Sequence, residues 1–332
     1  ESSSGFALKN DGTYTHNNGE LEIDDGAGTL AAKITGGSYL YDFTVTKADI
    51  IRFDGNTTIA NDLTIASDGL SGVLITNDAS STDYTLTVIG DAVISDGTLE
   101  ANQYGSGSSV SFGSLTINSG GTYSATSGTT TIQNSADHPQ FYNDNGGVFT
   151  HNNGTVVIDA TGTYYGKLRP AGTSNEFYDL TIQGIDFSVS YFDVNVENNL
   201  VVNSTYSGGP QGFYSNSGDY VELNVGGDMT IIENSVGYNN AGGTRIFGGI
   251  TVTGDVEIQD GGYLVTYGAS TRNCSFGSLT VQSGGTYDAT AGTTTITGLT
   301  SSSDYIKNSG TFTHNNGVIE INDSDGSGYL EG

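Results

Sequence analysis

The sequence predicts an all-β protein: a single-stranded right-handed parallel β-helix, or β-solenoid, of roughly a dozen or more coils. Three observations predict this fold. Thr, Val, Ile and Tyr are abundant, and stretches with helical periodicity are missing. Triplets in which apolar residues flank a polar one recur about 20 to 26 residues apart, which is the spacing of β-helix coils. Longer segments also repeat. The predicted handedness follows from the crossover preference of parallel strands.

The triplets are the predicted strands of the coils. They include residues 63–65, 115–117, 180–182, 200–202, 229–231 and 279–281. Because side chains alternate along a strand, each triplet has one buried face and one solvated face. This alternation directs four matched apolar residues into the coil: Leu115, Ile117, Leu279 and Val281. Asp-Gly and Asn-Gly pairs separate the triplets and are typical of turns.

A four-residue stretch, His-Asn-Asn-Gly, occurs three times, at 16–19, 151–154 and 314–317. Asn and Gly tolerate positive φ, so an Asn-Gly pair before an alternating strand predicts a strand–turn–strand unit. His16 and His151 would lie about six coils and about 28 Å apart. Ligands of one metal ion lie about 2 Å from it. We therefore expect each histidine to act locally, by hydrogen bonding across its own turn.

The longest internal match pairs residues 112–117 with 276–281 and continues to the His-Asn-Asn-Gly stretch. It defines two super-repeats, at about 6–150 and about 141–313. A third copy starts near residue 301. The sequence begins and ends at the same phase of this super-repeat, which favours a segment of a longer array.

The second super-repeat carries one extra unit. Residues 83–91 of the first copy have two counterparts in the second, at 219–228 and 250–255. We place the extra coil at about 219–245, because a stacked array tolerates the insertion of a whole unit. The chain, residues 1–332, is thus predicted to be one continuous β-solenoid. A β-propeller, with blades of about 40–50 residues, and stacked β-sandwich modules are the alternatives.

The chain is strongly acidic, with 9 Lys plus Arg, 37 Asp plus Glu and a formal charge of −28. Nucleic acids and anionic membranes are unsuited to it as partners, because binding phosphates needs clustered cations. No apolar run is long enough for membrane insertion. Cys274 is the single cysteine, which excludes a disulfide within the chain. Val110 occupies the matched position, so Cys274 is predicted to be a small buried hydrophobe.

Acidic turns after the repeated strands are the chemical candidates for a metal. Oxygen-rich loops suit calcium, which takes six to eight oxygen ligands. The predicted weak calcium ligands are Asp24, Asp25, Asp323 and Asp325. The pattern departs from an EF-hand loop, and ordinary solvated turns are the alternative. No other cofactor is expected.

The residues also bear on four further activities: polysaccharide cleavage by a lyase, glycoside hydrolysis, sugar binding and ice binding. A polysaccharide lyase needs a basic residue and a base, and Lys167 with Arg169 is the only close basic pair. No spacing singles out a pair of carboxylates for glycoside hydrolysis. Tyr123 and Tyr287 hold one repeat position and suggest a structural stack rather than a sugar-binding face. Thr rows suited to ice binding recur only about seven coils apart. We expect no catalytic residues and no enzyme.

The His-Asn-Asn-Gly stretch with its strand, as at 151–159, alternates with segments such as Phe-Tyr-Asp-Leu-Thr-Ile at 177–182. This pattern covers nearly the whole chain. It resembles the Gly/Thr/Asn-rich β-helical repeats of large bacterial surface adhesins and of marine phage tail fibres. The resemblance implies an extracellular β-helical stalk or fibre and brings no catalytic residues with it.

We therefore expect a non-catalytic structural fibre or stalk, part of a surface adhesin or filament. The expected location is extracellular, at a cell surface or on a virion. The expected partners are further coils, by self-association or by continuation of the array at both ends, where strand edges lack partners. Surface glycans are further candidate partners. The alternative is a carbohydrate-binding or carbohydrate-processing module of a phage tail fibre or tailspike.

Overall fold

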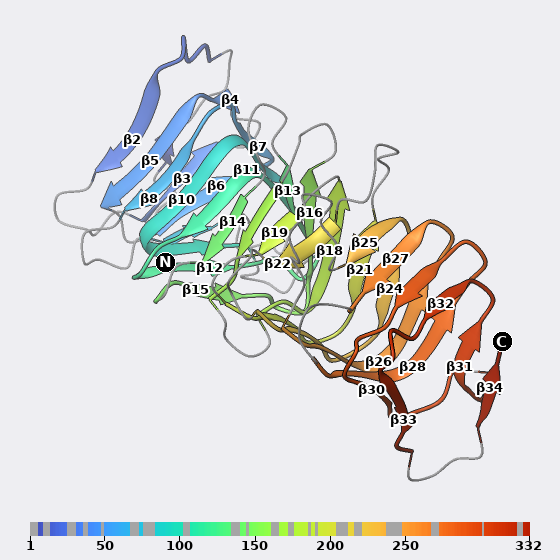
Figure 1. Cartoon of the computed structure of the whole chain (residues 1–332). Coiled ribbons are helices and arrows are strands. Elements are labelled where there is room, and N and C mark those ends of the chain that lie inside the picture. Colours follow the sequence, from blue (N-terminus) through green and yellow to red (C-terminus); the bar gives the residue numbers. More distant parts are fainter. Residues whose placement is uncertain are drawn as a thin grey trace. The chain divides into compact units, whose positions relative to one another are not determined.

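A computed structural model of the chain is all-β and forms a β-solenoid of stacked parallel strands (Figure 1). This confirms the predicted fold class, whereas the handedness and the number of coils stay predictions. The chain divides into two compact units, Glu1–Val157 and Ile158–Gly332. The structure describes residues 6–8, 14–24, 31–35, 39–47, 50–66, 73–75, 84–101, 107–133, 140–143, 146–160, 166–171, 176–184, 187–189, 192–203, 212–215, 221–236, 248–266, 272–300, 302–323 and 328–332.

In the first unit, every β-strand is short except one. The strands are β1 (Phe6–Leu8), β2 (Glu20–Asp24), β3 (Ala31–Thr35), β4 (Tyr39–Leu40), β5 (Asp42–Lys47), β6 (Ile50–Asp54), β7 (Thr57–Ile59), β8 (Leu63–Ala66), β9 (Val73–Ile75), β10 (Leu86–Glu100), β11 (Ser109–Ile117), β12 (Gly121–Ser124), β13 (Thr129–Gln133), β14 (Gln140–Asn143) and β15 (Val148–Thr150). The strand β16 (Thr155–Ala160) includes the boundary between the two units.

The second unit repeats this construction. Its strands are β17 (Gly166–Arg169), β18 (Asp179–Gly184), β19 (Phe187–Val189), β20 (Val194–Val196), β21 (Leu200–Asn203), β22 (Gly212–Ser215), β23 (Leu223–Val225), β24 (Met229–Ile231), β25 (Asn234–Val236), β26 (Ile250–Ile258), β27 (Gly262–Val265), β28 (Cys274–Val281), β29 (Thr286–Asp288), β30 (Thr293–Ile296), β31 (Asp304–Asn308), β32 (Thr311–Thr313), β33 (Val318–Ile321) and β34 (Tyr329–Glu331).

The long strand β10 shows how one coil is built. Its first part pairs in parallel with β7 and β11, its middle part with β8 and β11, and its last part with β9 and β12. The pairing register shifts between Val88 and Asp91, and Gly97 has a φ of 86°. One coil therefore contributes three short segments to three parallel stacks, with an irregularity at each change of stack.

The predicted extra coil, at about 219–245, overlaps three strands of the second unit. β23 pairs with β20 and β26, β24 pairs with β21 and β26, and β25 pairs with β22 and β27. These strands thus form a layer between two neighbouring coils. Residues 219, 220 and 237–245 of the prediction lie outside the described residues.

The core of each unit consists of columns of apolar side chains. In the first unit, Leu63 pairs with Ala92, Ala92 with Leu115, and Leu115 with Phe141. All four side chains are fully buried. The inward direction predicted for four residues is confirmed, because each is fully buried: Leu115, Ile117, Leu279 and Val281. In such columns, the apolar side chains of each coil are buried by those of the neighbouring coils, so a single coil cannot bury them alone.

Two buried tyrosines occupy equivalent places in the two units. The Tyr123 hydroxyl hydrogen bonds the Thr130 hydroxyl at 2.9 Å, and Tyr287 makes the same bond to Thr294. Both rings are fully buried, and burial raises the pKa of both phenols. The ring of Tyr123 stacks on Phe149, with centroids 5.7 Å apart. The predicted structural stack at this repeat position is confirmed.

The replacement Tyr123→Phe should lower the free energy of unfolding by about 1–3 kcal/mol, because it leaves the buried Thr130 hydroxyl without its partner. The double variant Tyr123→Phe/Thr130→Val should recover most of this loss, since neither polar group then remains. Urea unfolding at pH 7 measures both. A double variant that is less stable than either single variant would contradict the assignment.

Cys274 is buried, as its match to Val110 predicted. Burial raises the pKa of its thiol from 9.0 to about 11. The folded state therefore keeps the thiol neutral where the unfolded state ionises it, so its contribution to stability is complete below pH 9 and is lost as the pH rises towards 11.

Cys274→Val should fold normally, because the first unit carries Val110 at the matched position. Its free energy of unfolding should fall less than that of the unaltered chain between pH 9 and pH 11. Urea titrations across this range measure the difference, and Tyr123, whose pKa does not depend on Cys274, contributes equally to both proteins. If the free energies of unfolding of the two proteins change in parallel with pH, the pKa of Cys274 does not differ between the folded and the unfolded state.

Candidate functional site

The three His-Asn-Asn-Gly stretches form the same turn. The glycine N–H donates to the histidine carbonyl at 2.9 Å in each copy. The histidine Nδ1 accepts from the backbone N–H of the second Asn at 2.9–3.0 Å. The predicted local role of His16, His151 and His314 is thereby confirmed. Because Nδ1 accepts a hydrogen bond, the neutral imidazole carries its proton on Nε2.

The origin of the turn differs from the prediction in one respect. The prediction relied on positive φ at the Asn-Gly pair, but positive φ occurs at both asparagines, for example 49° at Asn152 and 60° at Asn153. This is the two-residue pattern of a type I′ turn. The glycine is needed for space instead, since a Cβ on Gly154 would lie 2.1 Å from the Thr126 carbonyl oxygen.

The first Asn of the turn ties it to the preceding coil. The Asn152 amide donates to the Ser124 hydroxyl at 3.0 Å and to the Ala125 carbonyl at 2.8 Å. The Asn315 amide donates in the same way to the Asp288 carboxylate and the Ala289 carbonyl. The turn is therefore a corner that holds two coils together, and each histidine belongs to a separate corner.

The predicted calcium ligands are only partly described. Asp24 is exposed at the end of β2, and Asp323 accepts a hydrogen bond from the Tyr305 hydroxyl at 3.2 Å. Asp25 and Asp325 lie outside the described residues. Within the described ranges, no three His, Cys, Asp or Glu side chains gather as a metal-binding group. The calcium prediction stays a prediction.

A ladder of acidic and amide side chains runs along one corner of each unit. In the first unit, the Asp42 Oδ1 accepts from the Asp62 N–H at 3.2 Å, and the Asp62 Oδ1 accepts from the Asp91 N–H at 2.9 Å. The Ser114 hydroxyl then donates to the Asp91 Oδ1 at 2.6 Å. We call this row, together with its counterpart in the second unit, the Asp ladder.

The counterpart runs through Asp179, Asn199, Asp228 and Asp255. The Asn199, Asp228 and Asp255 backbone N–H groups each donate to the Oδ1 of the preceding member, at 3.0, 2.9 and 2.8 Å. The Ser278 hydroxyl closes the row on Asp255 at 2.6 Å. Sequence reasoning missed this ladder, although the recurrence of Gly-Asp at 90–91, 227–228 and 254–255 was a signal for it.

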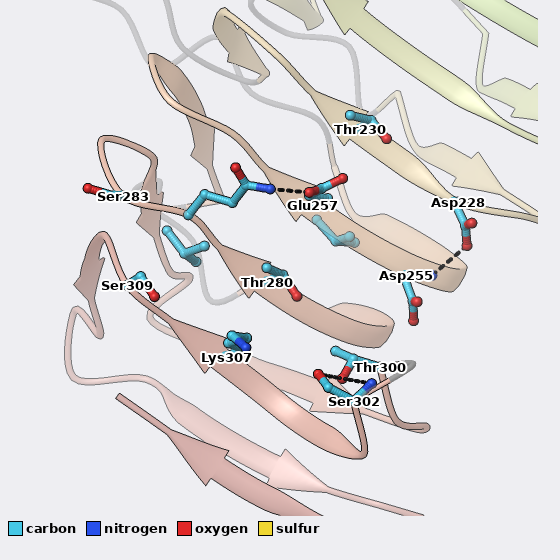
Figure 2. Close-up of a pocket in the computed structure, with 13 residues that line it drawn as sticks. Asp228, Thr230, Asp255, Glu257, Thr280, Ser283, Thr300, Ser302, Lys307 and Ser309 are labelled. Carbon is cyan, nitrogen blue, oxygen red and sulfur yellow. Dashed lines mark hydrogen bonds between the residues drawn. The ribbon is translucent and has the colours of Figure 1, made fainter.

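The second Asp ladder forms one side of an open groove of about 620 Å³ on the outer face of the second unit (Figure 2). A row of outward residues crosses it: Thr230 pairs with Glu257, Glu257 with Thr280, and Thr280 with Lys307. The remaining polar side chains of the lining are Asp228, Asp255, Gln282, Ser283, Thr300, Ser302 and Ser309. The groove is thus lined by hydroxyls, carboxylates, one amide and one ammonium group, together with Val256 and Val281.

The charged groups of the groove are held in place by neighbours. The Glu257 carboxylate accepts from the Gln282 amide and, at 3.4 Å, from the Gln259 amide. The Lys307 ammonium lies 3.4 Å from the Glu331 carboxylate. The Oδ2 atoms of Asp228 and Asp255 make no hydrogen bond to another described residue, so each keeps acceptor capacity at the groove. The arrangement suits hydrogen bonding to a polar ligand.

Comparisons with known proteins do not extend this description. No family model, no curated protein and no solved structure matches the chain. The described residues contain no helix that is long and apolar enough to cross a membrane. Lys167 and Arg169, the basic pair considered for a lyase, both lie half-buried on β17.

The replacement Gly154→Ala should lower the free energy of unfolding by about 1–3 kcal/mol, because the added methyl group overlaps the Thr126 carbonyl of the preceding coil. The control is Gly19→Ala, whose Cβ, among the described residues, meets only the His16 carbonyl of its own turn, at 3.1 Å. Thermal unfolding of both variants provides the comparison. Equal losses would contradict the role of Gly154 in coil packing.

Proposed function

We propose that this chain is a non-catalytic structural stalk or fibre segment of an extracellular surface protein, such as an adhesin or filament. The observation that carries the proposal is the Asp ladder. It joins successive coils through side chain–backbone hydrogen bonds in both units. Together with the apolar columns, the ladder connects each coil to the next, and its residues serve packing rather than a catalytic reaction. A coil-to-coil contact that recurs in this way suits an elongated structural protein.

The outward faces support the same proposal. In the first unit, Thr44 pairs with Thr64, Thr64 with Val93, and Val93 with Thr116. Such rows offer short, uncharged side chains and no converging acid and base. The negative charge of the chain keeps a long solenoid soluble and disfavours contact between like chains at their flanks.

The proposed partner is a further coil of the same kind. Among the described strands, β33 pairs only with β30 and β34 only with β31. Leu330 and Ile321 lie in the inward columns of these stacks, yet Leu330 is 69% and Ile321 38% exposed. A strand edge with exposed core columns is a template for a parallel strand. The coil comes from the same polypeptide or from another copy of it.

Deleting residues 223–249 should leave a folded protein. Leu223 pairs with Ile250 and Met229 with Val256, so the 27 residues correspond to one coil and β26 can take the place of β23 on β20. We expect the melting temperature to change by only a few degrees. The control deletes 223–235, about half a coil, and should unfold the second unit because it breaks every column. The proposed structural role is contradicted if the whole-coil deletion unfolds the second unit as much as the half-coil deletion does.

A further inference from the structure

The two units differ in one outward row. In the first unit the row crossing β8, β10, β11 and β14 is formed by Thr64, Val93, Thr116 and Tyr142. In the second unit the equivalent row across β24, β26, β28 and β31 is formed by Thr230, Glu257, Thr280 and Lys307. The threonines are kept, whereas a valine is replaced by a carboxylate and a tyrosine by an ammonium group.

These two charged residues cross the groove of the second unit (Figure 2). Glu257 and Lys307 lie on β26 and β31, with β28 and Thr280 between them. Two strand spacings separate them by about 10 Å, roughly the length of two sugar rings. Core packing requires neither charge, because the first unit has the uncharged residues Val93 and Tyr142 at the positions of Glu257 and Lys307.

The chemistry of the lining restricts the ligand. Carboxylate oxygens accept strong hydrogen bonds from hydroxyl or ammonium groups, and the Thr, Ser and Gln side chains both donate and accept. Three carboxylates face one ammonium group in the groove, and that ammonium group is itself paired with Glu331. A polyanion is disfavoured by this balance and by the charge of −28 on the chain.

We propose that this groove binds a saccharide chain that is neutral or carries amino groups. Glu257, Asp228 and Asp255 accept hydrogen bonds from its hydroxyl or ammonium groups, while Thr280 and Lys307 bind its oxygens. The volume of about 620 Å³ lies in the range of ligand sites, about 300–1,000 Å³. The open groove accommodates a chain rather than an enclosed monomer. The structural function proposed above does not depend on this site.

The test uses the full chain and three probes in calorimetric titrations: cellohexaose as the neutral chain, a chitosan hexamer as the amino chain and a hexagalacturonate as the anionic chain. We expect binding of the neutral or the amino probe and weaker or no binding of the anionic probe. Preference between the first two decides whether the acidic groups receive hydroxyls or ammonium groups. A chain that binds none of the probes, or binds only the anionic one, overturns the proposal.

Two variants locate the binding. Glu257→Val introduces the residue that the first unit tolerates at this position, and it should weaken binding about tenfold or more without lowering the melting temperature. Thr280→Val should also weaken binding, whereas the matched control Thr116→Val, at the same position of the first unit, should not. Unchanged affinity in Glu257→Val, or equal effects of the two threonine replacements, overturns the assignment to this groove.

Discussion

Parallel stacking at about 4.8 Å between coils places each residue directly on the equivalent residue of the next coil. In inward columns such as that of Leu63, apolar residues therefore lie on apolar residues. Apolar residues gain from this arrangement, as the column of Leu63, Ala92 and Leu115 demonstrates. Acidic residues would be destabilised by it, because stacked carboxylates repel. The Asp ladder resolves this conflict, since each Oδ1 accepts a hydrogen bond from the next coil: a backbone N–H within the row and a serine hydroxyl at its end. Hydrogen bonding to the charged group compensates for the repulsion.

The features that follow from local pattern were predictable from the sequence. Alternation in the triplet of Leu115 and Ile117 required no knowledge of the neighbouring coil, and both side chains are buried as expected. Repetition added the equivalence of Tyr123 with Tyr287 and of Cys274 with Val110. The turn at His151 was predictable for the same reason, because the two hydrogen bonds that close it, from the Asn153 and Gly154 N–H groups, stay between His151 and Gly154.

The features that depend on register between coils were not predictable. Asp62 bonds to Asp91 across 29 residues, whereas Asp91 bonds to Ser114 across 23. No fixed period reveals such partners, because turns of different length separate the strands. The role of Gly154 was hidden for the same reason, since the carbonyl it approaches belongs to Thr126 in the preceding coil. The groove also depends on register: Glu257 and Lys307 are 50 positions apart and line one groove only because both pair with the strand β28.

The same physics explains how a duplicated solenoid can acquire a binding face. A residue that points inward is constrained by the columns above and below it, so Leu115 and Leu279 remain identical in the two units. A residue that points outward contacts solvent and its lateral neighbours, and its replacement costs little stability. The positions of Val93 and Glu257 are equivalent in backbone pairing, yet only the second is charged. The Asp ladder beside them is common to both units and supplies acceptors in either case. A new recognition surface therefore requires few changes on this scaffold: outward charges placed next to a ladder that already exists for structural reasons.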